Sequence, residues 1–211
     1  MKKLSRFSAL LLAVLMTLSL AACGVGGQST NKEFSAGVTD GNTYTNEYFG
    51  FAATLDENWT LLTEEQIAQV TGQTTEILDD DNLAEMYEDG KVVMEMYGVR
   101  SDNSTVNITV ENLGLINGAK YDESGYADEA IKQLPDQLAT AGFENVQIDK
   151  TTVTFAGAEH TGITITATLQ GTPVQEIAAC IKVGNYVALI TAVTFGDSSP
   201  SEILDLFKAI K

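Results

Sequence analysis

Four alternating apolar segments follow one another near the C-terminal end of the chain, and this series most constrains the fold. The segments cover residues 146–155, 159–169, 173–183 and 186–195, and each break between them contains a glycine. Because glycine adopts positive φ at little cost, such breaks favour tight turns between neighbouring antiparallel strands. The sequence therefore predicts a four-stranded antiparallel meander.

Two capping boxes mark helix starts on either side of this meander. Thr63 and Gln66 are three residues apart, as are Ser199 and Glu202, a spacing at which each side chain bonds the free backbone N–H of the other. Phe207 would then lie on the apolar stripe of a C-terminal helix. The other expected elements are strands at 43–46 and 49–55, a helix at 63–72, a weaker helix or insertion at 75–89, strands at 92–99 and 106–110, a helix at 127–141 that contains Pro135, and the C-terminal helix at 199–210. Helices before, within and after the strands indicate an α+β fold, an antiparallel meander flanked by helices.

The first 23 residues have the layout of an export signal that ends in a cysteine. Three basic residues precede the apolar run 9–20, which is shorter than the about 20 residues needed to span a bilayer. Leu20-Ala21-Ala22-Cys23 then resembles the lipobox of bacterial lipoproteins. The resemblance implies cleavage before Cys23, a lipid anchor on its sulfur (a diacylglycerol thioether with further acyl chains such as palmitate), and a location on the outer face of a bacterial cell membrane. The alternative is an ordinary secretory signal with an incidental cysteine.

The chain is expected to have three segments. Residues 1–22 form the signal peptide, 23–42 a lipidated flexible tether, and 43–211 one domain. Five glycines lie between Gly24 and Asn42, and 19 flexible residues would reach about 24 Å. The domain of the mature chain is large enough for one hydrophobic core and too small for two.

Charge excludes some partners. Removal of residues 1–22, which carry Lys2, Lys3 and Arg6, leaves nine basic against 29 acidic side chains, a net charge of −20. Nucleic-acid binding needs Lys and Arg to neutralise phosphates, so we expect no nucleic-acid partner. Electrostatic docking on anionic lipid is disfavoured for the same reason.

The chain is poor in reactive side chains. His160 is the single histidine, and we expect it at an exposed hairpin edge. Cys180 lies in an apolar strand pattern and is expected to be buried and inert. With one histidine and one free cysteine we expect no zinc site, no other cofactor and no catalytic residue. The acidic stretch Asp79–Asp89 does not fit the register of a calcium loop and is expected to be a solvated surface.

Aromatic residues are dense at the start of the domain. Tyr44, Tyr48 and Trp59 could line a cleft for a sugar, peptide or aromatic ligand. The alternative is that aromatic residues on short strands before a helix belong to the core.

The same region resembles a known family. Residues 44–51, Tyr-Thr-Asn-Glu-Tyr-Phe-Gly-Phe, lead through Leu55–Trp59 to a capped acidic helix, as in PsbP-like domains, and the later half closes on Ser-Pro-Ser-Glu-Ile at 199–203. In this family a Pro-x-Gly-Trp turn precedes the helix, whereas this chain has Asp56-Glu57-Asn58 before Trp59. The resemblance implies an α/β/α sandwich over residues 43–211 and no catalytic residues.

Three function classes follow as expectations. The first is a non-enzymatic, membrane-anchored binding module for an unknown protein or small-molecule ligand. The second is a carboxylate-dependent hydrolase of cell-wall or extracellular polymer. The third is a passive structural surface protein.

Overall fold

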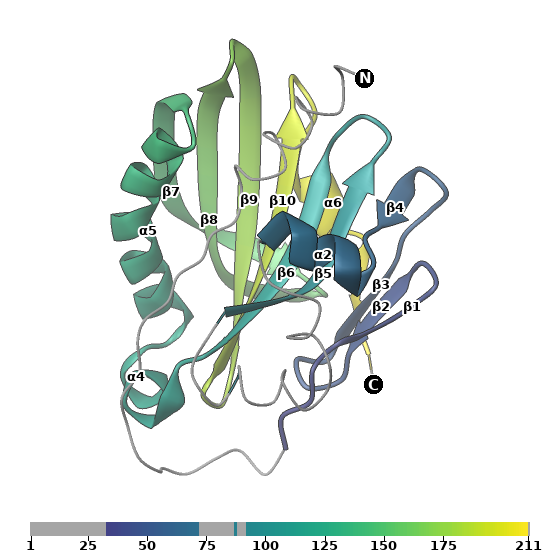
Figure 1. Ribbon diagram of the computed structural model, residues 1–211. Coiled ribbons are helices and arrows are strands. Elements are labelled where there is room, and N and C mark those ends of the chain that lie inside the picture. Colours follow the sequence, from purple (N-terminus) through teal and green to yellow (C-terminus); the bar gives the residue numbers. More distant parts are fainter. Residues whose placement is uncertain (1–32, 72–86, 88–91, 211) are drawn as a thin grey trace.

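The computed structural model describes residues 33–71, 87 and 92–210, and every structural statement below concerns these residues. Seven antiparallel strands form the main sheet in the order β4-β5-β6-β10-β9-β8-β7 (Figure 1). Their bounds are β4 Trp59–Leu61, β5 Val92–Arg100, β6 Thr105–Asn112, β7 Phe143–Phe155, β8 Ala158–Leu169, β9 Thr172–Val183 and β10 Tyr186–Phe195. Strands β7 to β10 pair in sequence, so the predicted meander is confirmed.

Two-residue turns set the register of this meander. Ala156-Gly157 joins β7 to β8, and Gln170-Gly171 joins β8 to β9. All four residues have positive φ, between 48° and 85°. Positive φ at both central positions is the mark of the turn whose twist matches that of the flanking strands.

A smaller sheet covers one face of the main sheet. Its order is β1-β2-β3-β11, with bounds β1 Val38–Asp40, β2 Thr43–Asn46, β3 Phe51–Thr54 and β11 Phe207–Ala209. Phe51 and Phe207 of the small sheet share one buried cluster with Ile108 and Ile190 of the main sheet. This cluster is the larger part of the hydrophobic core.

The two longest described helices lie on the opposite face of the main sheet. α5 (Glu123–Thr140) contacts β7, β8 and β9, and α2 (Glu64–Thr71) contacts β5 (Figure 1). Leu134 of α5 packs with Ile163, and Ile67 of α2 packs with Tyr97. α4 (Gly114–Lys120) precedes α5. In the described parts of the chain no helix is long and apolar enough to cross a membrane.

The helix start predicted at Thr63 is confirmed. The Thr63 N–H donates to Gln66 Oε1 at 2.9 Å and the Gln66 N–H to Thr63 Oγ1 at 3.3 Å, which is the predicted capping box. Pro135 lies inside α5, which stays one continuous helix. Residues 75–86 and 88–89 of the expected weaker helix lie outside the described residues.

The predicted C-terminal helix over residues 199–210 is wrong in its length. α6 covers only Ser201–Leu204, and its N-cap, Pro200, makes no side-chain capping bond. Phe207 then begins β11, which pairs with β3, and its ring packs between Phe51 and Phe155. Pairing with a sheet edge and burial of Phe207 therefore prevail over the helical pattern.

The outer layers also differ from expectation. The α/β/α sandwich is not confirmed, because the small sheet and not a helix layer covers the face opposite α5. The expected tether boundary at residue 42 is corrected too, since β1 already pairs with β2 at Val38–Asp40. The structure is consistent with the predicted α+β class, since it has mostly antiparallel strands and a few helices. Sequence patterns also gave no sign of β4 or α4, both of which are short.

Candidate functional site

A row of polar side chains runs along one face of the central strand β6. Asn107 is 2% exposed and Glu111 1% exposed, although β6 lies between β5 and β10 in the middle of the sheet. The other face of β6 is apolar. The polar row consists of Thr105, Asn107, Thr109 and Glu111, and the apolar row of Val106, Ile108 and Val110.

Neighbouring strands extend this polarity across the sheet. Asn107 pairs with Tyr97 of β5 on one side and with Thr191 of β10 on the other. Glu176 of β9 pairs with Val193, which in turn pairs with Thr105. We call the set formed by Tyr97, Thr105, Asn107, Glu176 and Thr191 the polar face. It points to the side of the sheet that carries α2 and α5, because Tyr97 packs on Ile67 of α2.

Two atoms of the polar face have no hydrogen-bond partner in the described part of the chain. They are Asn107 Nδ2 and Glu176 Oε1, and both are buried. Burial raises the pKa of Glu176 to about 8, so its carboxyl is protonated at neutral pH. The pKa of Tyr97 rises to about 12, mainly through burial and slightly through Glu176, while a hydrogen bond with Thr105 opposes the rise.

The far end of the polar row is satisfied within the protein. Tyr126 of α5 donates its hydroxyl to Glu111 Oε2 at 3.1 Å. Burial and the charge of Glu111 raise the pKa of Tyr126 well above its usual range. Glu111 pairs with Val187 and Glu176 with Val193, so the two glutamates are on the order of 20 Å apart along the sheet.

A partly buried glutamate, Glu95, faces the small sheet. It is the extra residue of a β-bulge in β5, between Met94 and Met96. Its oxygens accept hydrogen bonds from the hydroxyls of Tyr44 and Tyr87 at 2.5 Å each. The Asn46 amide and the Gly37 N–H add bonds of 2.9 and 3.0 Å. Oε2 accepts three of these bonds and Oε1 accepts the fourth, so the side chain of Glu95 fastens the small sheet to β5.

The N-terminal end of the described chain packs on the side of the main sheet that carries the small sheet. Phe34 stacks on Tyr186 with ring centroids 3.9 Å apart and planes 6° apart. Tyr48 and Tyr87 contact the Phe34 ring edge-on at 5.1 and 4.6 Å. Part of the expected tether is therefore held against the domain.

The three aromatic residues that were predicted to line a ligand cleft each make a different contact within the protein. Tyr44 is 1% exposed and donates to Glu95. Tyr48 is 4% exposed and donates to the carbonyl of Val183 at 3.0 Å. Trp59 is half-buried on β4, with the Arg100 guanidinium 5.5 Å from its ring centroid. The hydroxyls that a ligand would use are thus already bound within the protein.

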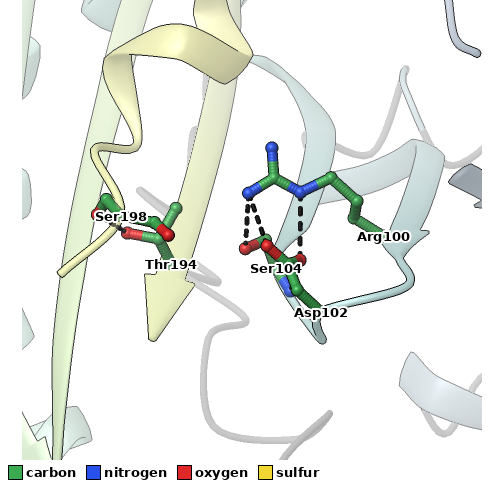
Figure 2. A network of polar contacts seen from close by, with 5 residues as sticks. All are labelled: Arg100, Asp102, Ser104, Thr194 and Ser198. Carbon is green, nitrogen blue, oxygen red and sulfur yellow. Dashed lines mark hydrogen bonds and ion pairs between the residues drawn. The ribbon is translucent and has the colours of Figure 1, made fainter. Parts of the chain in front are cut away.

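Arg100 organises the β5–β6 hairpin rather than a reaction centre. Figure 2 shows its guanidinium against Asp102 and Ser104, with Nε to Asp102 Oδ1 at 3.0 Å and Nη2 to Asp102 Oδ2 at 2.7 Å. The hydrogen bond from Arg100 lowers the pKa of Asp102 to about 2. In the same view Thr194, near the end of β10, donates to the Ser198 carbonyl at 2.6 Å.

His160 and Cys180 both lie near the start of α5. His160 is not at an exposed edge as expected: β8 is an inner strand, and His160 Nδ1 lies 2.9 Å from Glu123 Oε1. Glu123 also accepts the backbone N–H groups of Thr161 and Lys182, where β8 and β9 part. Cys180 is buried, as predicted, and burial together with Glu123 raises the pKa of its thiol to about 12.

An open hollow of about 580 Å³ lies where α4 meets α5. Its wall includes Lys120, which donates to the hydroxyl of Tyr121, and Lys182, which donates to the carbonyl of Gly184. These polar groups have partners within the protein, so the hollow is a weaker candidate than the polar face. Over the described residues no three His, Cys, Asp or Glu side chains gather as metal ligands. Cys23 and all of Asp79–Asp89 except Tyr87 lie outside those residues.

Sequence reasoning missed Asn107 and Glu176. The alternation of β6 was visible, yet alternation alone is typical of a strand with one solvated face. A polar row becomes informative only once the strand is known to be central and buried on both faces. No pattern in the sequence indicates that β6 is central and buried on both faces.

Comparisons with known proteins identify no family. No protein-family model matches the chain, and no curated protein matches it. Among solved structures the chain is similar to LpqN, a protein involved in cell envelope biogenesis of Mycobacterium tuberculosis. The two share 13% sequence identity with a TM-score of 0.39, over 76% of this chain and 83% of LpqN. A likeness at this level carries no argument about fold or function.

Proposed function

We propose that this protein is a non-enzymatic, lipid-anchored binding module on the outer face of a bacterial cell membrane. The observation that carries the binding role is the polar face, where Asn107 Nδ2 and Glu176 Oε1, both buried, have no hydrogen-bond partner among the described residues. The anchor rests on the lipobox that ends at Cys23. A domain held by acyl chains is retained at the membrane while its ligand site stays outside the cell.

A carboxylate-dependent hydrolase is the second candidate, and the buried glutamates do not favour it. Glycosidases place their two carboxyl groups about 5–10 Å apart. Glu111 and Glu176 are separated by roughly twice that distance. Glu95 faces the opposite side of the sheet, where four donors hold it.

A passive structural protein is the third candidate. Such a protein has no use for unpartnered polar atoms in its interior, because each costs about 1–3 kcal/mol of stability. The polar face therefore favours the binding role over the passive one. Membership among PsbP-like domains remains part of the proposal, and it rests on the motifs at residues 44–59 and 199–203.

The anchor is tested in cells with Cys23→Ala. We expect a labelled fatty acid to mark the wild-type protein and not the variant, and the variant to be released or to remain an uncleaved precursor. If both proteins partition into detergent alike without label, the lipid anchor is wrong.

The choice between binding module and hydrolase is tested on the purified chain. We expect no turnover across a panel of cell-wall and extracellular polymers. Reproducible turnover abolished by substitution of one Asp or Glu would establish the hydrolase instead. Recovery of one stoichiometric partner from surface-crosslinked cells would support binding of a protein.

A further inference from the structure

We infer that the polar face binds an uncharged ligand carrying an amide or an equivalent donor–acceptor pair, held between the Asn107 amide and the Glu176 carboxyl. This inference rests on the proposed function and names the ligand class of its site. Two observations carry it: the unpartnered atoms Asn107 Nδ2 and Glu176 Oε1, and the strand register, which places both residues on the same face of the main sheet.

Unpartnered polar atoms in a protein interior need an explanation. More than nine in ten buried polar groups have a hydrogen-bond partner, because an unmade bond leaves the cost of dehydration uncompensated. Here two such atoms belong to one face of one sheet, and three further polar side chains surround them. A site that receives its missing partners from a ligand accounts for both atoms together.

The register places the two side chains within reach of one small molecule. Asn107 pairs with Thr191, and Thr191 pairs with Ala178, two residues from Glu176 on the same face of β9. Two strand spacings across and two residues along put the Cα atoms of Asn107 and Glu176 roughly 12 Å apart. Both side chains lie on the same face of the sheet, with Thr191 and Val193 of β10 between them. A ligand that bonds both side chains therefore has to reach across β10.

Both helices, α2 and α5, lie on this side of the sheet, and α5 also shares a buried cluster with Val193 of β10. α5 contacts β7, β8 and β9, whereas α2 contacts β5. The strands that carry Asn107 and Thr191, β6 and β10, lie between these two sets in the sheet order (Figure 1). Glu176 thus belongs to a strand that α5 contacts, whereas Asn107 lies on β6, between those strands and the strand that α2 contacts.

The chemistry of the two groups selects an uncharged ligand. Asn107 Nδ2 is a donor and requires an acceptor. Burial keeps the Glu176 carboxyl protonated at neutral pH, so it offers a donor and an acceptor without a charge. None of the five residues of the polar face carries a positive charge to hold an anion. An amide supplies both complementary groups in one planar unit.

The first test measures stability in the absence of ligand, on the full-length chain in detergent. If the two side chains serve a ligand, replacing them by apolar groups of similar shape removes an unpartnered polar atom. We expect Asn107→Leu and Glu176→Met each to raise the melting temperature by about 2–4 °C. The matched control is Tyr126→Phe, which deletes a satisfied hydroxyl on the same side of the sheet and should lower it. If the melting temperature of both site variants falls as much as that of Tyr126→Phe, Asn107 and Glu176 have a structural role and the inference is wrong.

The second test measures binding by saturation-transfer NMR with three small probes: N-methylacetamide, acetate and methylammonium. We expect N-methylacetamide to give a signal with the wild type that drops at least fivefold in Asn107→Leu and in Glu176→Met. Glu176→Gln, which stays neutral and keeps a donor and an acceptor, should retain the signal within about twofold. If N-methylacetamide gives no signal, or one that these variants leave unchanged, the inference is wrong. A stronger signal from methylammonium that Glu176→Gln abolishes would replace it with a cation site.

Failure here is distinct from failure of the proposed function. Fatty-acid labelling at Cys23 and partner capture report on the anchored module in cells, whereas the probes report only on the polar face. An anchored protein that captures a partner but binds no amide would keep the proposed function and lose this inference.

Discussion

At the scale of single residues, burial decides the chemistry of this protein more than residue type does. Three glutamates, Glu95, Glu111 and Glu176, lie on two faces of one sheet and have different surroundings. Glu95 accepts four hydrogen bonds and Glu111 accepts one from Tyr126, whereas Glu176 Oε1 has none. Among these three glutamates, Glu176 therefore has the environment that suits a ligand.

Glu176 should give the unfolding free energy a distinctive pH dependence. Its pKa is about 8 in the folded protein against 4.5 as the ordinary value, so between these pH values the folded state binds more protons than the unfolded state. Its contribution is therefore fully present below about pH 4.5 and falls as pH rises toward 8, by about 3–5 kcal/mol. Denaturant unfolding at pH 5 and pH 8 should show this loss in the wild type and a smaller one in Glu176→Gln. The exposed Glu144→Gln should behave like wild type, and an unchanged slope in Glu176→Gln would contradict the assignment.

Ala156 carries backbone strain that a better turn residue would relieve. Its φ is 48°, a left-handed conformation that costs an L-residue with Cβ about 1 kcal/mol. Asn tolerates this conformation and commonly precedes Gly in such turns. We expect Ala156→Asn to raise the unfolding free energy by about 0.5–1 kcal/mol. Thermal denaturation measures the change, and Ala158→Asn, on the strand that follows the turn, should give no gain.

At the scale of elements, the last ten residues show how sheet pairing overrides a helical pattern. A helix from 199 to 210 would place Phe207 and Ile210 on one stripe and bury them alike. In the structure Phe207 is 1% exposed within the aromatic core, whereas Ile210 is half-buried. The two arrangements therefore predict different costs for truncating these side chains.

Phe207→Ala is expected to destabilise the protein by about 3–5 kcal/mol, because it leaves a cavity beside Phe51 and Phe155. Ile210→Ala should cost clearly less, about 1 kcal/mol, since much of its surface is already solvated. Urea unfolding of the two variants measures both values. Equal costs would favour the continuous helix over β11.

At the scale of the whole molecule, charge and layering act together. The small sheet and α5 cover opposite faces of one seven-stranded sheet. Around this core the full chain carries a formal net charge of −17. Like charges on a compact surface repel one another and lower its stability.

Salt should therefore stabilise the protein. The Debye length falls from about 30 Å at 0.01 M to about 8 Å at 0.15 M monovalent salt, which screens the repulsion. We expect the melting temperature to rise over this range in a sodium chloride titration. Calcium at matched ionic strength should add nothing further. A calcium-specific rise that disappears in Asp79→Asn/Asp81→Asn would instead make the acidic stretch a metal site.

Elements whose signals are local could be predicted from the sequence. The four meander strands follow from alternation and glycine breaks, and the start of α2 follows from the Thr63–Gln66 box, because both depend on neighbours a few residues apart. The buried state of Cys180 was predictable for the same reason, from the apolar run around it.

Tertiary structure alone decided the layers and the site. Whether residues 207–209 form a helix or a strand depended on an open edge at β3, 150 residues earlier in the chain. The polar row of β6 became a candidate site only when β5 and β10 enclosed it and Glu176 arrived from β9. Contacts between strands distant in sequence set the burial of each side chain, and burial decides which polar atoms are left for a ligand.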